Sequence, residues 1–250
     1  MQFIRSLSLA SAGLCCLPTL VQAEPWHFEV SPYLWAVGQS GKTGFKTDNG
    51  NDIITDMDMS FGDIWDNLDS AFLMDAKASK GDWAFSVNYV YMKLKNEGDI
   101  GNNGRATVEG KQNLIDVTAA YRFYNQGNMA WYGVFGARFA DVDNSLTTTT
   151  DNRYKNRGFG DDWVDPLLGI KNRWQINSTF YLDTQFDMAG FGLSSSSDFS
   201  WGIGTTLNHK LSENWYLKYN YRYLDIDYKS NKLIFDMASS GLALGVSYMF

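Results

Sequence analysis

The sequence predicts an all-β protein, a closed antiparallel β-barrel of about ten strands that spans a membrane. Apolar residues recur at every second position in one segment after another, which is the period of a strand. Aromatic residues make up 16% of the chain, yet the mean hydropathy is −0.30. Beyond the N-terminal segment the sequence contains no apolar run long enough for a transmembrane helix. A closed sheet is then the way for such a chain to cross lipid with its backbone hydrogen bonds satisfied.

The first segment, residues 1–23, is predicted to be a cleavable secretory signal peptide. Arg5 precedes an apolar run that ends at the small-residue site before Glu24. Both cysteines lie in this segment, so we expect a mature protein without thiol chemistry, disulfides or thiolate metal sites. Residues 24–250 are predicted to form one exported barrel domain.

The charge of the chain excludes nucleic acid as a partner. The formal net charge is −7, and loss of Arg5 with the signal peptide makes it −8 (−7 − 1), whereas nucleic-acid binding needs a basic surface. Two glycine-rich pieces, at 190–192 and 202–204, lack the spacing of a phosphate loop and are interpreted as bends. We predict no cofactor and no metal.

The strands are predicted in order from the alternation. The first begins at Trp26 and places apolar residues on one parity and polar residues on the other. The apolar parity is predicted to face lipid and the polar parity the lumen. The clearest lipid-facing positions are Phe28, Val30, Leu34, Phe72, Met74, Ala76, Ile115, Val117, Ala119, Phe135, Ala137, Phe139, Leu168, Ile170, Phe186, Met188, Leu217, Tyr219, Tyr221 and Tyr223.

Connections of two lengths alternate along the chain. Short turns are predicted near 80–81, 125–128, 177–178 and 212–213, and longer polar loops at 38–69, 96–105, 150–160, 191–197 and 229–232. Short periplasmic turns and longer external loops are the usual arrangement in such barrels. Counting strands between them favours ten, with eight or twelve left open, because 41–59 can be an extra hairpin above the membrane or an irregular loop.

Aromatic residues near the predicted short turns indicate a girdle at the membrane interface. They are Trp83, Trp131, Trp174, Trp215 and Tyr181. The alternative is a soluble β-sandwich with aromatic core ends, which we weigh as the minor possibility.

The last strand carries a terminal signature. Apolar residues alternate up to a final aromatic residue, at Leu244, Val246, Tyr248 and Phe250. This resembles the C-terminal signature of bacterial outer-membrane barrels. The resemblance implies a Gram-negative outer membrane with its lipid and lipopolysaccharide as surroundings, and the barrel-assembly machinery and periplasmic chaperones as partners in transit.

Three further stretches, 31–35, 163–169 and 187–192, resemble a group of small proteobacterial outer-membrane proteins that are distantly like the outer membrane protein A and W barrels. This resemblance implies a fold and a location, and it implies no reaction.

The polar parity predicts a network of charges in the lumen. Its members are Glu29, Asp75, Lys77, Asp116, Arg122, Arg138, Asp165, Lys171, Arg173, Asp183, Asp187, Lys218 and Arg222. Asp165, Lys171, Arg173, Asp183 and Asp187 are the favoured lumen site. Opposite charges are nearly balanced, so in a barrel of this size they are expected to pair across strands and leave no wide pore.

Two functions follow from such a lumen. We expect a narrow passive channel for small solutes or ions, in which unpaired charges set selectivity. The alternative is a non-conducting structural or surface-interaction barrel held by salt bridges. A membrane-embedded lipid-modifying enzyme is the weakest possibility, because the only histidines, His27 and His209, lie toward the periplasmic ends of their strands and no nucleophile, base and acid can be grouped. We therefore predict that the protein is not an enzyme.

The predicted first external loop, 38–69, is acidic, and it contains Phe61, Ile64, Trp65 and Leu68 at helical spacing. A short amphipathic helix could cap or plug the barrel mouth there. A calcium site on Asp56 and Asp58 is one interpretation and a solvated acidic loop the other, and the solvated loop is favoured because the spacing of an EF-hand is missing.

Overall fold

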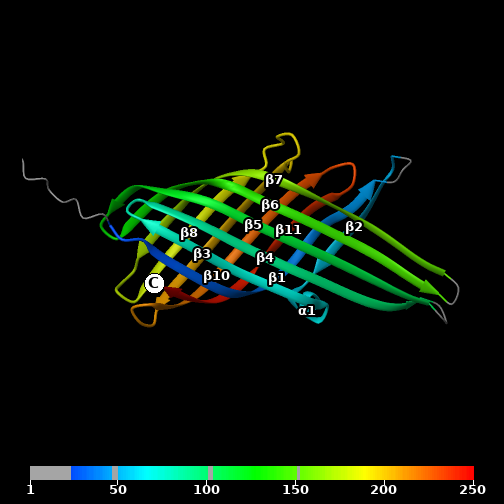
Figure 1. The fold of residues 1–250 in the computed structure, drawn as a ribbon, viewed down its shortest axis with the longest axis horizontal. Helices are drawn as coiled ribbons and strands as arrows, with labels where there is room; N and C mark the ends of the chain where they lie inside the picture. The colour runs from blue at the N-terminus through cyan, green and yellow to red at the C-terminus, as the bar shows by residue number, and fades with distance from the viewer. Residues whose placement is uncertain (1–23, 47–49, 101–103, 151–152) are drawn as a thin grey trace, which may run out of the picture.

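A computed structural model describes residues 24–46, 50–100, 104–150 and 153–250, and the predicted signal peptide, 1–23, lies outside the described residues. The described chain forms one antiparallel sheet of eleven strands and one short helix (Figure 1). The elements are β1 (His27–Lys46), β2 (Asp52–Met59), α1 (Phe61–Asp66), β3 (Leu68–Lys80), β4 (Trp83–Ile100), β5 (Gly104–Gln126), β6 (Met129–Thr150), β7 (Arg153–Gln175), β8 (Phe180–Ala189), β9 (Phe199–Lys210), β10 (Trp215–Lys229) and β11 (Ile234–Met249).

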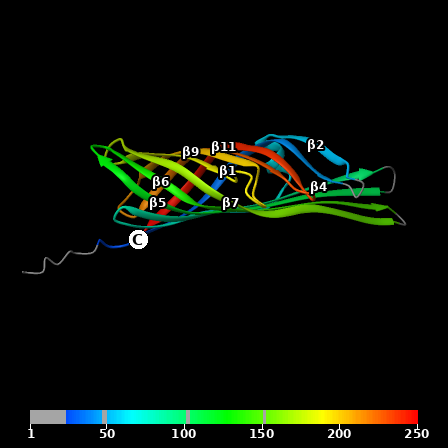
Figure 2. The same cartoon turned by 90° about the horizontal axis from the view of Figure 1, so that it is seen from above.

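The sheet closes on itself because the first strand pairs with the last. β1 and β11 are in register from the pair Glu29 and Met249 to the pair Gly44 and Ile234. Among the described strands, ten follow one another around the ring, and β2 is an eleventh that pairs with β1 alone. The prediction of a closed barrel of about ten strands is confirmed (Figures 1 and 2).

The segment 38–69 is not the loop that the sequence predicts. Residues 27–32 of β1 pair with β3, and residues 39–46 of the same strand pair with β2. The helix α1 connects β2 to β3. Of the two alternatives for 41–59, the structure contains the hairpin. Glycine permits the close pairing, since a Cβ on Gly44 would lie 2.2 Å from the carbonyl oxygen of Ile53.

The short helix α1 connects β2 to β3 and lies against β1 and β2. Ser60 caps it, because its hydroxyl oxygen accepts a hydrogen bond from the Asp63 amide while the Asp63 carboxylate accepts one from the Ser60 amide at 2.8 Å. These hydrogen bonds from Ser60 hold the pKa of Asp63 below its usual range. Ile64 packs with Val37 and Met92, whereas Trp65 is exposed. The predicted amphipathic helix is therefore present, with one face packed against side chains of β1 and β4 and the other face exposed.

Strands β4 to β7 continue well beyond the rest of the barrel (Figures 1 and 2). β7 pairs with β6 along its whole length but with β8 only from Leu167 to Gln175. The predicted loops 96–105 and 150–160 are therefore wrong, since the strands run to Ile100 and Thr150 and resume at Gly104 and Arg153. They were missed because both faces are mostly polar once the strands leave lipid, so the regular apolar alternation stops although the pairing does not.

The predicted facing of the strands is confirmed. Val117 and Phe135 are exposed on the outer surface, whereas Thr118 lines the lumen. The exposed apolar belt includes Phe28, Leu34, Phe72, Phe85, Val87, Val117, Phe135, Phe139, Val164, Leu168, Ile170, Ile203, Tyr219, Tyr221, Leu242, Leu244 and Val246. Within the described residues, no helix is long and apolar enough to cross a membrane.

The aromatic girdle is confirmed in part. Trp83, Trp174 and Trp215 are exposed beside the short turns. Tyr181 is wrongly placed in it, because its ring is buried and lies under the guanidinium of Arg173 at 4.4 Å. Tyr181 has the inward parity of β8, which its position at the strand end concealed.

Candidate functional site

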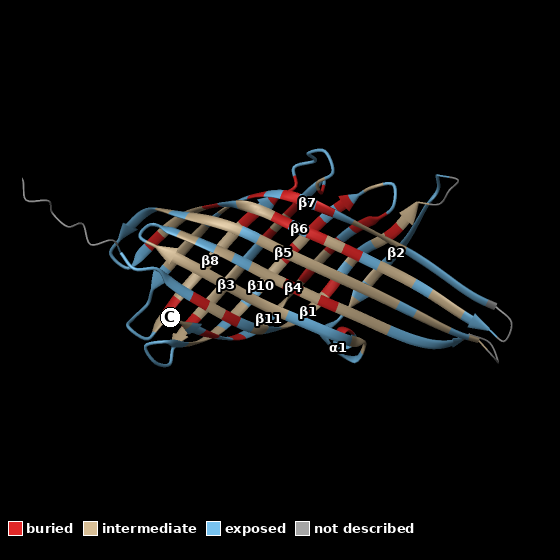
Figure 3. Ribbon diagram, viewed as in Figure 1, coloured by how far each residue is buried: buried red, intermediate tan, exposed pale blue. Residues whose placement is uncertain are grey.

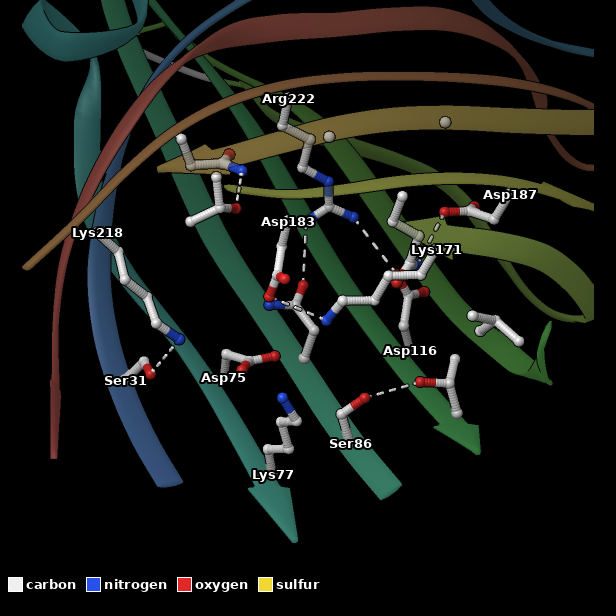
Figure 4. A pocket seen from close by; sticks show the side chains of 18 of the residues that line it. Ser31, Asp75, Lys77, Ser86, Asp116, Lys171, Asp183, Asp187, Lys218 and Arg222 are labelled. Carbon is white, nitrogen blue, oxygen red and sulfur yellow. Dashed lines mark hydrogen bonds and ion pairs between the residues drawn. The ribbon is translucent and has the colours of Figure 1, made fainter. Parts of the chain in front are cut away.

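A cavity of about 260 Å³ occupies the lumen toward the short-turn end (Figure 4). Six cationic and five acidic side chains line it. They are Lys77, Arg138, Lys171, Arg173, Lys218 and Arg222, and Glu29, Asp75, Asp116, Asp183 and Asp187. The polar parity of β1, β3, β5, β6, β7, β8 and β10 supplies them, so the barrel brings together eleven of the thirteen residues predicted for the lumen.

Arg138 is the centre of the first charge cluster. Its guanidinium is 1% exposed and donates to Asp116 at 2.8 Å and to Asp187 at 3.0 Å, with a third bond to the Ser200 hydroxyl at 2.8 Å. Arg222 reaches Asp116 from the opposite side at 3.4 Å. This cluster links β5, β6, β8 and β10 across the lumen. Each of its four charges has an oppositely charged partner, as buried charges require.

Asp183 is the centre of the second cluster. Arg173 donates to both of its carboxylate oxygens at 2.7 Å, and the Lys171 ammonium lies 3.2 Å away. One carboxylate therefore serves two cations of the neighbouring strand. The bidentate geometry fixes the planes of both groups.

The third cluster joins the two ends of the chain. The Glu29 carboxylate forms an ion pair with Lys218 and accepts a hydrogen bond from the Ser247 hydroxyl at 2.7 Å. Lys218 also donates to Ser31 at 2.9 Å. These contacts tie β1 to β10 and β11 close to the seam where the barrel closes.

Asp75 and Lys77 differ from the other charged residues of the cavity. Neither forms an ion pair or hydrogen bond with any residue that the structure describes. Figure 4 shows both side chains directed into the cavity from β3.

Asp165 is wrongly predicted as a member of the ion-pair network. It lies opposite Arg138 in the register, but Arg138 turns to Asp116 and Asp187. The buried Asp165 carboxylate instead accepts bonds from the Ser197 amide at 2.7 Å, the Ser197 hydroxyl at 2.8 Å and the Trp163 indole at 3.2 Å. Asp165 thus pins the connection between β8 and β9 against the barrel.

Arg122 is also wrongly placed in the lumen site. It lies near the end of β5, next to the register shift before Tyr124, and it binds Asp82 in the turn between β3 and β4 at 2.7 Å. Arg122 lies close to the short-turn end of the barrel, so its side chain reaches the turn and not the cavity.

On the external side of the cavity, apolar side chains fill the lumen. We call this cluster the lumenal plug, and its buried members are Ala140, Val142, Trp163, Leu224, Ile226, Tyr228, Leu233, Phe235 and Met237. Trp163 of β7 stacks on Tyr228 of β10 with ring centroids 3.9 Å apart. In Figure 3 the buried stretches lie midway along β6 and β7, whereas the far ends of these strands are exposed.

The plug was missed by sequence reasoning, although a signal for it exists. From Leu224 to Tyr228 the inward parity of β10 is apolar, as it is in β11 at Phe235 and Met237. A lumen that contained water would place polar side chains there. Apolar residues on the lumen parity therefore indicate where a barrel is filled.

Asp161 fastens the hairpin between β10 and β11 over the plug. Its carboxylate accepts a bond from the Tyr228 hydroxyl at 2.9 Å and lies 3.2 Å from the Lys232 ammonium. Burial alone would raise the pKa of Asp161, but the hydrogen bonds from Ser230, Tyr228 and Lys232 outweigh burial and hold this pKa below its usual range. The fastening is therefore present at neutral pH and is lost only as the pH falls through that lowered pKa.

The residues weighed for metal binding and catalysis are apart from one another. No three His, Cys, Asp or Glu side chains in the described part of the chain are grouped to hold a metal ion, and Asp56 and Asp58 lie on the exposed strand β2. His209 stacks on Phe180 with centroids 4.5 Å apart, and His27 is exposed at the start of β1.

Comparison with known proteins agrees with this geometry. Residues 7–250 match the model of the family described as outer membrane protein beta-barrel domain. The search of curated proteins finds no match. The outer membrane protease OmpT from Escherichia coli is similar in structure, with a TM-score of 0.55, 8% identity, and coverage of 90% of this chain and 97% of that chain.

Two further solved structures are more distant. The translocator domain of the autotransporter NalP from Neisseria meningitidis has a TM-score of 0.45 and 10% identity, covering 92% of this chain and 91% of that chain. Neisserial surface protein A has a TM-score of 0.34 and 15% identity, covering 90% and 97%. At these identities the likeness to OmpT concerns the fold alone. The family match covers nearly the whole sequence, and the chain therefore belongs to the outer membrane protein beta-barrel family and is a protein of the bacterial outer membrane.

Proposed function

We propose that this protein is a non-conducting outer-membrane barrel that acts at its external end as a surface-interaction protein. The observation that carries the proposal is the lumenal plug. Trp163, Leu224 and Met237 are each only 2% exposed, so solvent hardly reaches these side chains. An apolar constriction of this kind blocks ions because they would have to shed their hydration shells.

The projecting parts of β4 to β7 support the surface role. Beyond the apolar belt these strands remain fully paired with one another, which gives the molecule a folded external surface where other barrels have loops. At the level where the belt ends, Asp141 and Asp162 are cross-strand neighbours on the outer face. The paired strands therefore present a folded external surface with acidic side chains and exposed apolar ones such as Tyr154, which could serve as a fixed binding epitope.

A narrow passive channel for small solutes or ions is the second candidate, and the charged cavity favours it. Such a channel would require the plug to open, because the cavity ends beneath Leu224 and Leu167. The proposal assigns no enzymatic activity, since neither histidine has an acid and a nucleophile beside it among the described residues.

Planar-bilayer recording of the refolded protein distinguishes the two candidates. We expect no discrete conductance steps from the wild type, and steps from a variant with both Trp163→Ala and Tyr228→Ala, because the stacked rings are removed from the plug. The matched control is Trp215→Ala with Tyr248→Ala, an aromatic pair 4.9 Å apart on the outer face, which should stay silent. Discrete steps from the wild type would reject the non-conducting role.

The surface role is tested by shortening the projecting hairpins. Deleting 96–108 and 147–156 joins Lys95 to Glu109 and Leu146 to Arg157, which are cross-strand pairs, so the register of the barrel is kept. We expect the shortened protein to insert normally. Where a strain with the wild-type protein differs at its surface from a strain without it, for example in cell-to-cell aggregation, the shortened protein should not restore that difference. A difference that survives the deletion would assign the function to the barrel body.

We also propose that Leu244, Val246, Tyr248 and Phe250 are the signal read by the barrel-assembly machinery. All four side chains are exposed on the outer face of the C-terminal strand, where a docking surface could bind them before β11 pairs with β1.

A further inference from the structure

Lys77 is a lumen cation without a counter-ion in contact. Its cross-strand neighbours are Glu29 on β1 and Ser86 on β4. Glu29 is already bound by Lys218 and Ser247, and Ser86 is hydrogen-bonded to Thr118 at 2.9 Å. Among the residues that the structure describes, nothing lies within hydrogen-bond or ion-pair distance of the Lys77 ammonium, which is directed into the cavity (Figure 4).

The charges around Lys77 do not cancel. In the first cluster the positive charges of Arg138 and Arg222 are balanced by two carboxylates. These are the carboxylates of Asp116 and Asp187. The rest of the cavity contains four cations, Lys77, Lys171, Arg173 and Lys218, and three acids, Glu29, Asp75 and Asp183. This half of the cavity therefore has one positive charge in excess, in surroundings where an unpaired charge is costly.

Asp75 alone does not neutralise this half. It lies two residues from Lys77 on the same strand, so the two Cα atoms are about 7 Å apart, and no ion pair joins the side chains. Asp183 meanwhile serves both Lys171 and Arg173. A negative group placed between the ammoniums of Lys77, Lys171 and Lys218 would complete the charge balance that the protein leaves open.

We propose that the lumenal cavity binds a small oxyanion of the phosphate or carboxylate class, with Lys77 as its principal contact. Lysines suit such a ligand because an ammonium is a compact charge with three donors that can follow the position of an oxyanion. The volume of about 260 Å³ admits a small anion with some water. The plug closes the cavity on the external side, so an extended chain could not thread through it.

The site differs from the proposed surface role and does not depend on it. A bound anion would join β3, β7 and β10 from inside, because Lys77, Lys171 and Lys218 belong to these three strands. A bound anion would therefore raise the free energy of unfolding. Once the anion concentration exceeds the dissociation constant, this gain grows with the logarithm of the concentration.

The test is calorimetric titration of the refolded, detergent-solubilised barrel with sodium phosphate and, separately, sodium succinate. Sodium chloride at equal ionic strength is the salt control, and unfolding temperature is followed in parallel. We expect saturable binding of phosphate or succinate, with a rise in unfolding temperature that chloride does not reproduce. The two titrations decide which kind of oxyanion the cavity prefers.

Three variants locate the site. Lys77→Met should abolish binding, and Asp75→Asn should tighten it by about tenfold, because a negative charge beside the anion is removed. Lys95→Met, whose lysine lies outside the cavity and pairs with Glu97, should change nothing. Equal stabilisation by chloride, or unchanged affinity in Lys77→Met, would overturn the proposal. If Lys77→Met does not refold, unchanged affinity in Asp75→Asn would overturn the proposal instead.

Discussion

Replacing Arg138 with methionine is expected to lower the free energy of unfolding of the inserted barrel by about 3–5 kcal/mol. The guanidinium is fully enclosed and serves Asp116, Asp187 and Ser200 together. Methionine keeps much of the volume, but it leaves Asp187 without a cation and Asp116 with Arg222 alone, and burying an unpaired charge is strongly unfavourable. The measurement is urea unfolding in lipid vesicles, followed by tryptophan fluorescence.

A matched arginine provides the control for this experiment. Arg122→Met removes an arginine that pairs with Asp82 near the short-turn end, where solvent screens the interaction, and should cost at most about 1 kcal/mol. Adding Asp187→Asn to Arg138→Met should recover part of the loss, because Asp116 keeps Arg222 as its partner and no buried carboxylate of this cluster then remains unpaired. A similar cost for Arg138→Met and Arg122→Met would mean that the lumen cluster is hydrated and contributes little.

Replacing Val117 with arginine is expected to destabilise the inserted barrel by about 2–4 kcal/mol. Val117 lies midway along the membrane-facing part of β5, with Ala119 and Tyr121 toward one interface and Ile115 toward the other. An arginine there must place its charge at the level of the lipid chains or bend toward an interface. Unfolding in vesicles measures the difference from wild type.

Val108→Arg is the control on the same strand. Val108 is 52% exposed and Val117 43% exposed, so exposure alone predicts similar tolerance for the two substitutions. Val108 lies in the projecting part of β5, and arginine there should change stability by less than about 0.5 kcal/mol. Equal effects at the two positions would contradict the assignment of lipid as the surroundings of the apolar belt.

The charged residues of the candidate site were largely predictable one by one but not as contacts. Alternation assigns Asp183 and Glu29 to the lumen parity, because each strand repeats with a period of two. It does not reveal that Asp183 is shared by Lys171 and Arg173, or that Glu29 turns from Lys77 to Lys218. Those choices depend on how far each side chain reaches across a closed ring.

Each error has a physical origin that the structure identifies. Polar hairpins beyond the belt were predicted as loops because the apolar pattern ends where lipid ends, although the backbone pairing of β6 and β7 continues. Asp165 was predicted to pair with cations, and it holds the Ser197 loop. The plug was missed because its members come from strands that are distant in sequence, such as Trp163 and Tyr228.

The sequence by itself determined that this chain is a membrane barrel of about ten strands, and it determined which face of each strand meets lipid. Both properties follow from local repetition, since neighbouring side chains on a strand point to opposite faces. Only the tertiary structure decided which charges pair, where the lumen is filled and that Lys77 is left without a partner. These depend on closure of the ring, which brings β1 beside β11 and places side chains from opposite walls in contact.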